Sequence, residues 1–198
     1  QPIEAKLKIT RQILEVLDRF QHPVGIITKS ALILRDIDIL SRMAERKLVS
    51  VAISINTLDE SLRRQLEPRT ASIPRRLQVI EELSKAGIHV HAMLAPVIPG
   101  LNDHELMDLM AAVAGAGAKN AGYITVRLNG DVGPIFTDWV HKKYKDRADK
   151  ILNRIMDIHG GQLNDSRSGI RMKGEGKYAE MIAAQFQLAL KRHLPVPE

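Results

Sequence analysis

Cysteine is absent from this sequence of 198 residues, and aromatic residues are scarce, with three Phe, three Tyr and one Trp. The lack of cysteine excludes disulfides and thiolate ligands for a metal cluster. Few aromatic rings leave little material for a platform that stacks nucleic-acid bases. No apolar run approaches the roughly 18 residues of a membrane-spanning helix, and the start does not resemble a signal peptide. We therefore expect a cytoplasmic protein without membrane contact.

The composition is that of a folded domain with a mildly basic surface. Hydrophobic residues make up 44% of the sequence, enough for one substantial core. The 29 Lys and Arg residues exceed the 23 Asp and Glu residues, giving a formal charge of +6. Such a charge attracts polyanions at long range, but it also fits a surface that only confers solubility.

Short β-branched runs alternate with amphipathic patterns over the first two thirds of the sequence. The runs predict strands of the kind that are buried on both faces, and apolar residues at helical spacing predict helices between them. The expected helices span 6–20, 35–46, 74–86 and 102–114, and the expected strands span 24–28, 49–55, 88–96 and 122–128. This order predicts an α/β fold with parallel strands and right-handed crossovers.

The alternation stops after Asp131. Helices are expected over 135–144, 147–159 and 178–193, with a Gly-, Ser- and Arg-rich loop over 160–176. We therefore expect residues 1–130 to form a partial β/α barrel and residues 131–198 to form a helical extension packed on it, as one domain overall.

Polar residues follow the predicted strands, at the ends where ligands collect in parallel β/α folds. The segments at these ends are Thr28-Lys29-Ser30, Ser54-Ile55-Asn56, Ala95-Pro96-Val97 and Arg127-Leu128-Asn129. The spacing alone fits two interpretations equally well. In one these side chains bind a ligand, and in the other they solvate loops and form turn hydrogen bonds.

A carboxylate and several guanidinium groups follow the second predicted strand. Glu67 and Arg69 lie in the run LEPR, and Arg75 and Arg76 come shortly afterwards. Arginine and carboxylate form bidentate pairs, so this cluster has two interpretations. It either grips an anion or forms a structural ion-pair cluster that fixes the loop.

Three further patterns are weaker. His89 and His91 have the H-x-H spacing of some metal sites, but they come early in a strand, where packing roles are usual. The run 174–179 fits a loose dinucleotide fingerprint, which needs a preceding strand. The basic residues at 167, 171, 173 and 177 suit phosphate contacts, but a solvated charge run explains them as well.

The order of segments resembles a known family. IITKS, RDIDIL, VAISINTLDE, LEPRTASIPRRLQVIEEL and AGIHVHAMLAPVIPGLND are similar to the middle of radical S-adenosylmethionine (radical SAM) proteins, in the DNA photolyase-like branch related to spore photoproduct lyase. The resemblance implies a partial (β/α)6 barrel in which the strands here are the third to the sixth. The first two strands, with the cysteine loop, would precede Gln1.

The same resemblance implies cofactors and an activity. Members hold a [4Fe–4S] cluster on three cysteines and cleave S-adenosylmethionine reductively to a 5′-deoxyadenosyl radical. The chain would then be part of such an enzyme, inactive as it stands, with neither cofactor bound. The cofactor-binding residues implied by the motifs are Lys29, Ser30, Ser54, Asn56, Pro96 and Val97. Possible substrate or anion contacts are Glu67, Arg69 and Arg127. The resemblance identifies neither a catalytic residue nor a metal ligand in this chain.

Partners follow from the same resemblance. A nucleic-acid lesion is the substrate that the photolyase-like branch implies, by analogy. An unpaired sheet edge at residues 24–28 would favour a homo-oligomer. Two alternatives come from other classes: a cluster-free β/α-barrel enzyme that uses Lys29 as a Schiff-base nucleophile, and a non-catalytic nucleic-acid-binding module.

Overall fold

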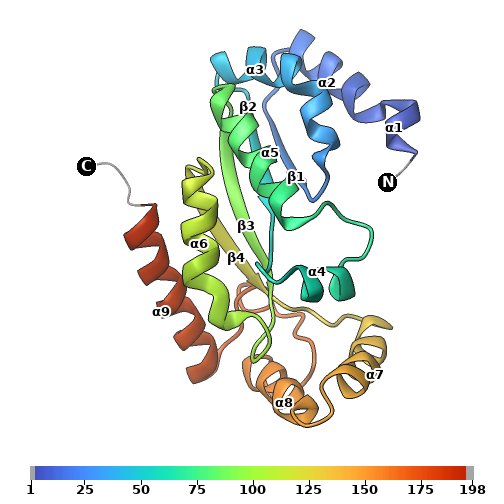
Figure 1. Cartoon of the computed structure of the whole chain (residues 1–198), viewed down its shortest axis with the longest axis vertical. Coiled ribbons are helices and arrows are strands. Elements are labelled where there is room, and N and C mark those ends of the chain that lie inside the picture. Colours follow the sequence, from blue (N-terminus) through green and yellow to red (C-terminus); the bar gives the residue numbers. More distant parts are fainter. Residues whose placement is uncertain (1–2, 195–198) are drawn as a thin grey trace. The chain divides into compact units, whose positions relative to one another are not determined.

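A computed structural model describes residues 3–194. Four strands, β1 (Val24–Thr28), β2 (Val49–Ser54), β3 (His89–Val97) and β4 (Asn120–Thr125), form one sheet in the order β1-β2-β3-β4 (Figure 1). β1 pairs with β2 and β2 with β3 in parallel. Backbone bonds from Lys119 to Val90 and from Val126 to Val97 continue the parallel order to β4. The predicted α/β fold with parallel, sequentially ordered strands is confirmed.

Helices connect and follow the strands. Their bounds are α1 (Glu4–Leu7), α2 (Ile9–Arg19), α3 (Ile37–Glu45), α4 (Glu60–Leu66), α5 (Ile73–Lys85), α6 (Leu106–Gly115), α7 (Val132–Lys143), α8 (Ala148–Ile158) and α9 (Gly176–His193). Two short 3₁₀ helices, η1 (Ala31–Asp36) and η2 (Asp103–Glu105), precede α3 and α6. Among residues 3–194, no helix combines the length and apolarity needed to cross a membrane.

Three details differ from the sequence-based expectations. The helix expected over 6–20 is interrupted at Lys8, whose φ of 53° lies in the left-handed region. The strand expected to reach Leu128 ends at Thr125, whose N–H bonds to the carbonyl of Met172. Helix α4 was not expected at all. Asp59 caps it by accepting from the N–H groups of Ser61 and Leu62.

Contacts between residues divide the chain into two compact units. The first, here the N-terminal unit, comprises Gln1–Met93 and Ala112–Gly122, and the second, the C-terminal unit, comprises Leu94–Ala111 and Tyr123–Glu198. The division passes through β3 and β4. The division into a core up to residue 130 and a helical extension stays a prediction.

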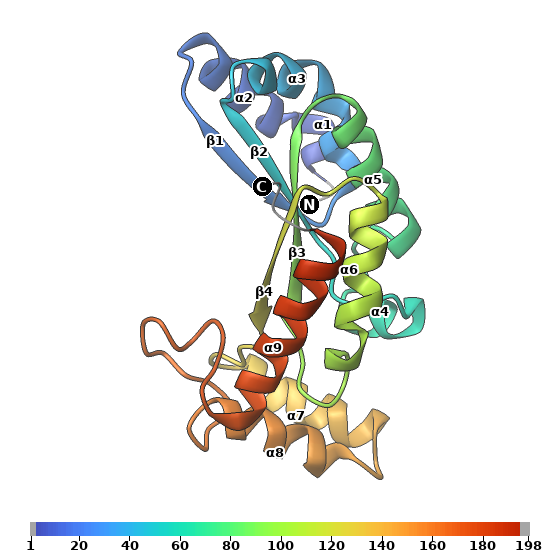
Figure 2. The ribbon, with the colours of Figure 1, turned by 90° about the vertical axis from the view of Figure 1, so that its left-hand side faces the viewer.

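In the N-terminal unit, one face of the sheet is covered by helices. Figures 1 and 2 show α3 and α5 on the same side of β1 and β2. Val51 and Ile53 of β2 point into this layer and are at most 1% exposed. The opposite face is open, and Ile27 of β1 is 68% exposed. The expectation that these strands are buried on both faces is wrong for β1, which lies at the sheet edge.

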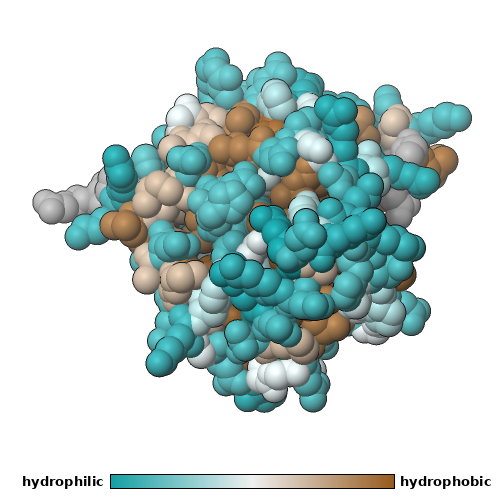
Figure 3. Space-filling view, turned by 60° about the horizontal axis from the view of Figure 1, so that its bottom comes forward, coloured by the Kyte–Doolittle hydropathy of each residue, from teal (hydrophilic) through white to brown (hydrophobic). Residues whose placement is uncertain are grey.

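The C-terminal unit has its own core. Helix α8 contacts α7 on one side and α9 on another. Ile155 of α8 and Ile182 of α9 are fully buried, and the rings of Tyr123 and Phe186 lie 4.7 Å apart. The face of the molecule in Figure 3 is mostly hydrophilic, with smaller hydrophobic areas between the hydrophilic side chains.

Candidate functional site

Lys29 directly follows β1 and forms an ion pair. Its Nζ lies 3.0 Å from Oε1 of Glu67, and its side chain is 37% exposed. Glu67 is contributed by the loop after α4, far along the chain from β1. The structure therefore brings together two of the residues selected from sequence.

Ser54 and Asn56 lie at the corresponding end of β2. Ser54 is the last residue of the strand, and both side chains are almost fully buried, at 6% and 3% exposed. The Ile55 N–H between them bonds to the carbonyl of Met93 on β3. The backbone here is held by the sheet, so Ser54 has a fixed position at the end of the sheet where β1 and β2 stop.

Glu67 and Arg76 form a buried pair that joins these two strand ends. Arg76 Nη2 lies 2.6 Å from Oε2 of Glu67, the oxygen that does not hold Lys29. Arg76 Nη1 donates to the carbonyl of Ser54 at 2.9 Å, and Arg76 also donates to the Thr70 hydroxyl. A continuous chain of contacts thus runs from Lys29 through Glu67 and Arg76 to the end of β2.

A second buried arginine supports the same loop from α4. Arg63 donates to the carbonyls of Glu67 and Thr70, both at 3.1 Å, and its Nε donates to Glu60 at 2.8 Å. The N–H of Ile73 also donates to the Glu60 carboxylate, and this bond, followed by the one from Arg63, lowers the pKa of Glu60. These contacts match the expectation of an ion-pair cluster that fixes the loop.

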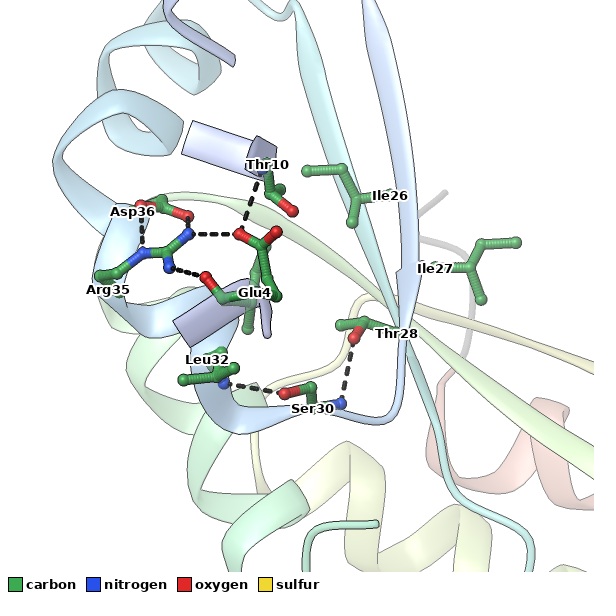
Figure 4. Close-up of a pocket in the computed structure, with 10 residues that line it drawn as sticks. Glu4, Thr10, Ile26, Ile27, Thr28, Ser30, Leu32, Arg35 and Asp36 are labelled. Atoms are coloured by element: carbon green, nitrogen blue, oxygen red, sulfur yellow. Dashed lines mark hydrogen bonds and ion pairs between the residues drawn. The ribbon is translucent and has the colours of Figure 1, made fainter. Parts of the chain in front are cut away.

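A cavity of about 490 Å³ opens beside Lys29. Its lining includes Lys29, Ser30 and Arg69, so two cationic side chains face one cavity in the N-terminal unit. The Ser30 hydroxyl already accepts from the N–H of Leu32 and caps η1, while its own N–H donates to the Thr28 hydroxyl (Figure 4). Ser30 therefore has a clear structural role in this loop.

A smaller cavity of about 210 Å³ lies near η1 and is also lined by Thr28 and Ser30. Figure 4 shows its polar side chains satisfying one another. Arg35 donates to the Glu4 and Asp36 carboxylates at 3.0 and 2.8 Å, and the Thr10 N–H donates to Glu4 at 3.1 Å. The Arg35 hydrogen bond is the main cause that lowers the pKa of Glu4. This cluster fastens α1 to η1.

Pro96 and Val97 end β3 in the C-terminal unit, and the following loop is held by side chains. Asn102 Oδ1 accepts from the Ile98 N–H at 2.6 Å, and its Nδ2 donates to the carbonyl of Pro96 at 3.0 Å. Asp103 Oδ1 accepts from the Gly100 N–H within the same loop, at 2.9 Å.

Tyr178 of α9 fastens this loop, and its ionisation gives a pH prediction. Its hydroxyl donates to Asp103 Oδ2 at 2.5 Å. Burial, and then the bond to Asp103, raises the pKa of Tyr178 to about 12, from an ordinary value of 10.0. Because the folded pKa is the higher one, this stabilisation is complete below about pH 10 and is lost as the pH rises to about 12.

We expect Tyr178→Phe to lower the free energy of unfolding by about 1 kcal/mol at neutral pH. The variant should also lose less stability than the wild type between about pH 10 and pH 12. Urea unfolding at a series of pH values measures both effects. Parallel pH profiles for the wild type and Tyr178→Phe would contradict this account.

Arg127 follows β4 in the C-terminal unit and is half-buried. Its Nη1 lies 3.8 Å from the sulfur of Met172, and its buried Nε has no acceptor among the residues that the structure describes. A buried donor without a partner is uncommon in proteins and suits a residue that contacts a ligand. Arg127 therefore stays a predicted contact.

The structure also shows the surroundings of the three weaker sequence patterns. His89 and His91 lie at the start of β3, and burial, followed by His89, lowers the pKa of His91. Within residues 3–194, no group of three or more His, Cys, Asp or Glu residues is placed to hold a metal ion. The run 174–179 follows a loop rather than a strand. Arg167 in the basic loop is paired with Asp165 and Glu175.

The sequence reasoning did not include Arg63 or Arg76 among the site residues. A signal for Arg76 was present, because it falls on the apolar face of its helix together with Ile73, Ile80 and Leu83. An arginine on a buried helix face needs a partner, and Glu67 was the nearest carboxylate in the predicted loop. Arg63 had no such signal, because α4 itself was not predicted.

Comparisons with known proteins identify the family of this chain. A family model described as the radical SAM superfamily matches residues 3–113, more than half of the chain. The chain belongs to the radical SAM superfamily. This shows the family that the sequence resemblance implied, and members of this family use S-adenosylmethionine and a [4Fe–4S] cluster.

Curated relatives of this radical SAM chain are longer proteins. An uncharacterized protein of Mycobacterium tuberculosis is 30% identical over 148 residues, which cover 74% of this chain and 44% of the relative. An uncharacterized protein of Methanocaldococcus jannaschii is 34% identical over 105 residues, which cover 53% of this chain and 39% of the relative. The chain thus spans less than half the length of these relatives.

Solved structures show the same fold. Spore photoproduct lyase complexed with dinucleoside spore photoproduct matches 98% of this chain and 56% of the lyase chain, with a TM-score of 0.68 and 16% identity. A mutant of this lyase with bound AdoMet and the same dinucleoside matches equally well, with a TM-score of 0.68 and 15% identity. At this identity the likeness establishes the fold.

The two cofactors of the radical SAM superfamily fit this chain differently. A [4Fe–4S] cluster is held by cysteine thiolates, and the sequence has no cysteine, so the residues of this chain do not fit the cluster. S-adenosylmethionine carries a carboxylate, which lysine and arginine bind through charge-assisted hydrogen bonds. Lys29 and Arg69 fit that carboxylate, because both line the cavity of about 490 Å³ at the end of β1.

Proposed function

We propose that the N-terminal unit binds the carboxylate of S-adenosylmethionine, as part of a longer radical SAM enzyme that cleaves this cofactor reductively. The cavity beside Lys29 carries the proposal. It combines two cations at the carboxyl end of a parallel strand, where β/α folds bind their ligands. The family to which the chain belongs supports the choice of S-adenosylmethionine.

The remaining residues have proposed roles at the other strand ends. Ser54 and Asn56, buried at the end of β2, supply hydrogen bonds to the ribose or to the methionyl group of the cofactor. Pro96 and Val97, at the end of β3 beside the loop that Asn102 holds, pack against adenine. Arg127 contacts the substrate or an anion. Each role is a proposal, and each residue lies at or after the carboxyl end of its strand.

Titration of the chain with S-adenosylmethionine, followed by two-dimensional NMR, tests the proposal. Weak binding is expected, because the chain lacks the cluster ligands, and NMR detects affinities into the millimolar range. The signals that move should include Lys29, Ser30 and Arg69. S-adenosylmethionine that leaves these signals unchanged at millimolar concentration would overturn the proposal.

We also propose that the complete enzyme acts on a lesion in nucleic acid. The support is the fold shared with a lyase complexed with a dinucleoside photoproduct, together with the net charge of +6. Binding of lesion-containing and undamaged oligonucleotides at several salt concentrations tests this part. A lesion enzyme should prefer the damaged strand at every salt concentration, whereas equal affinities would contradict the proposal.

The Schiff-base alternative has little support in the contacts of Lys29. Such lysines are activated by apolar surroundings or a neighbouring cation. The group 3.0 Å from Lys29 Nζ is instead the Glu67 carboxylate. Borohydride trapping with a carbonyl compound separates the two functions, and a reduced adduct on Lys29 would favour the Schiff-base enzyme.

A further inference from the structure

Arg76 is a deeply buried charged side chain near the proposed cofactor site. It lies on the inner face of α5 and is 1% exposed. Its three nitrogens all have partners in the N-terminal unit: Nε donates to the carbonyl of Ala71 at 3.0 Å, Nη1 to that of Ser54 at 2.9 Å, and Nη2 to the Glu67 carboxylate at 2.6 Å. Arg76 does not line the cavity beside Lys29, so it does not touch a ligand there.

The charges of this cluster do not cancel. Lys29 and Arg76 contribute one positive charge each, and Glu67, which bridges them, contributes one negative charge. Two minus one leaves one positive charge. Without Arg76, the Glu67 carboxylate would be left to Lys29 alone, and the pair would be neutral. An anion that approaches Lys29 would then meet no net attraction from this pair.

We propose that Arg76 is a positioning residue that keeps Lys29 available for an anionic ligand by balancing the charge of Glu67. The inference rests on the proposed function, and it extends that function to a residue outside the ligand cavity. Arg76 has a second effect through the same side chain. Its bond to the Ser54 carbonyl holds the end of β2 relative to Glu67, and so relative to Lys29.

Charge balance makes a prediction that a purely structural role of Arg76 does not make. Arg76→Met should weaken S-adenosylmethionine binding on the order of tenfold, because the charge-assisted attraction of Lys29 is lost. Glu67→Gln should bind at least as tightly as the wild type. The double variant Arg76→Met/Glu67→Gln restores the net charge of one, and its affinity should return to within about threefold of the wild type.

Arg75→Met is the matched control. Arg75 is the neighbouring residue on α5, is 41% exposed and pairs with Glu82 outside the cluster, so its loss should leave the affinity unchanged. Circular dichroism confirms the fold of each variant. If Arg76→Met does not fold, the affinities of the wild type, Glu67→Gln and the double variant still test whether Arg76 acts by balancing the charge of Glu67. A folded double variant that binds about tenfold more weakly than the wild type would overturn it.

Sulfate, titrated while the Lys29 side-chain signals are followed by NMR, separates this inference from the proposed function. If the sulfate affinities of the variants follow the expected order while S-adenosylmethionine does not bind, S-adenosylmethionine is rejected as the ligand and the role of Arg76 is kept. If S-adenosylmethionine binds equally well to the wild type and to folded Arg76→Met, the proposed function is kept and the role of Arg76 is rejected. A sulfate affinity that stays the same when the net charge of the cluster changes would likewise overturn the role of Arg76.

Discussion

Arg63→Met is expected to lower the free energy of unfolding by about 2–4 kcal/mol. Removing one partner of a buried ion pair costs about 3–5 kcal/mol, and the lower range applies here because the Glu60 side chain is 30% exposed. The loss also leaves the carbonyls of Glu67 and Thr70 without the donor that holds the loop. Urea denaturation at neutral pH measures the change.

Arg64→Met provides the control for this prediction. Arg64 approaches the same Glu60 carboxylate at 3.8 Å but is 70% exposed, so its loss should cost no more than about 0.5 kcal/mol. The Arg63 effect should shrink in acid. The pKa of Glu60 is lowered from 4.5, so the contribution of the pair is present above that pH and is lost as the pH falls through the folded value. Equal effects of the two substitutions would contradict the account.

Lys29→Ala is expected to weaken S-adenosylmethionine binding by about 1.5–3 kcal/mol, the range for a hydrogen bond to a charged group. Ser54→Ala removes a neutral bond and should cost about 0.5–1.5 kcal/mol. Neither change should unfold the protein, because Glu67 keeps its bond to Arg76 and the Ser54 backbone keeps its place in the sheet.

His89→Ala is the control for these two variants. His89 is exposed at the start of β3, away from the carboxyl ends of the strands, so its loss should leave cofactor affinity unchanged. Titration of the three variants establishes the order. Wild-type affinity for both Lys29→Ala and Ser54→Ala would remove these residues from the site.

The sheet could be predicted from sequence because its signals are local. The runs at 24–28 and 49–54 are short, β-branched and followed by helical patterns, and the parallel order follows from the alternation. The ends of these strands then identify Lys29 and Ser54 as neighbours at one edge of the sheet. Strand ends in parallel sheets are fixed by topology, so few alternatives remain.

The connections of the site could not be predicted in the same way. The bond between Arg76 and Ser54 joins residues that are 22 positions apart and depends on how α5 packs on the sheet. The apolar face of α5 marks Arg76 rather than Arg75 as the buried arginine, but the sequence does not show which groups its guanidinium bonds. Asn102 and Asp103 look like helix caps, yet their side chains bond back into the loop. Such choices are made by tertiary contacts.

The most direct test of the proposed site compares two ligands on two proteins. Methylthioadenosine lacks the carboxylate of S-adenosylmethionine but keeps the ribose and adenine. If Lys29 binds the carboxylate, Lys29→Ala should weaken S-adenosylmethionine binding by about tenfold or more and leave methylthioadenosine binding unchanged. NMR titrations of both ligands against the wild type and Lys29→Ala give the four affinities. A loss of the same size for both ligands, or for neither, would contradict the assignment of Lys29 to the carboxylate of the cofactor.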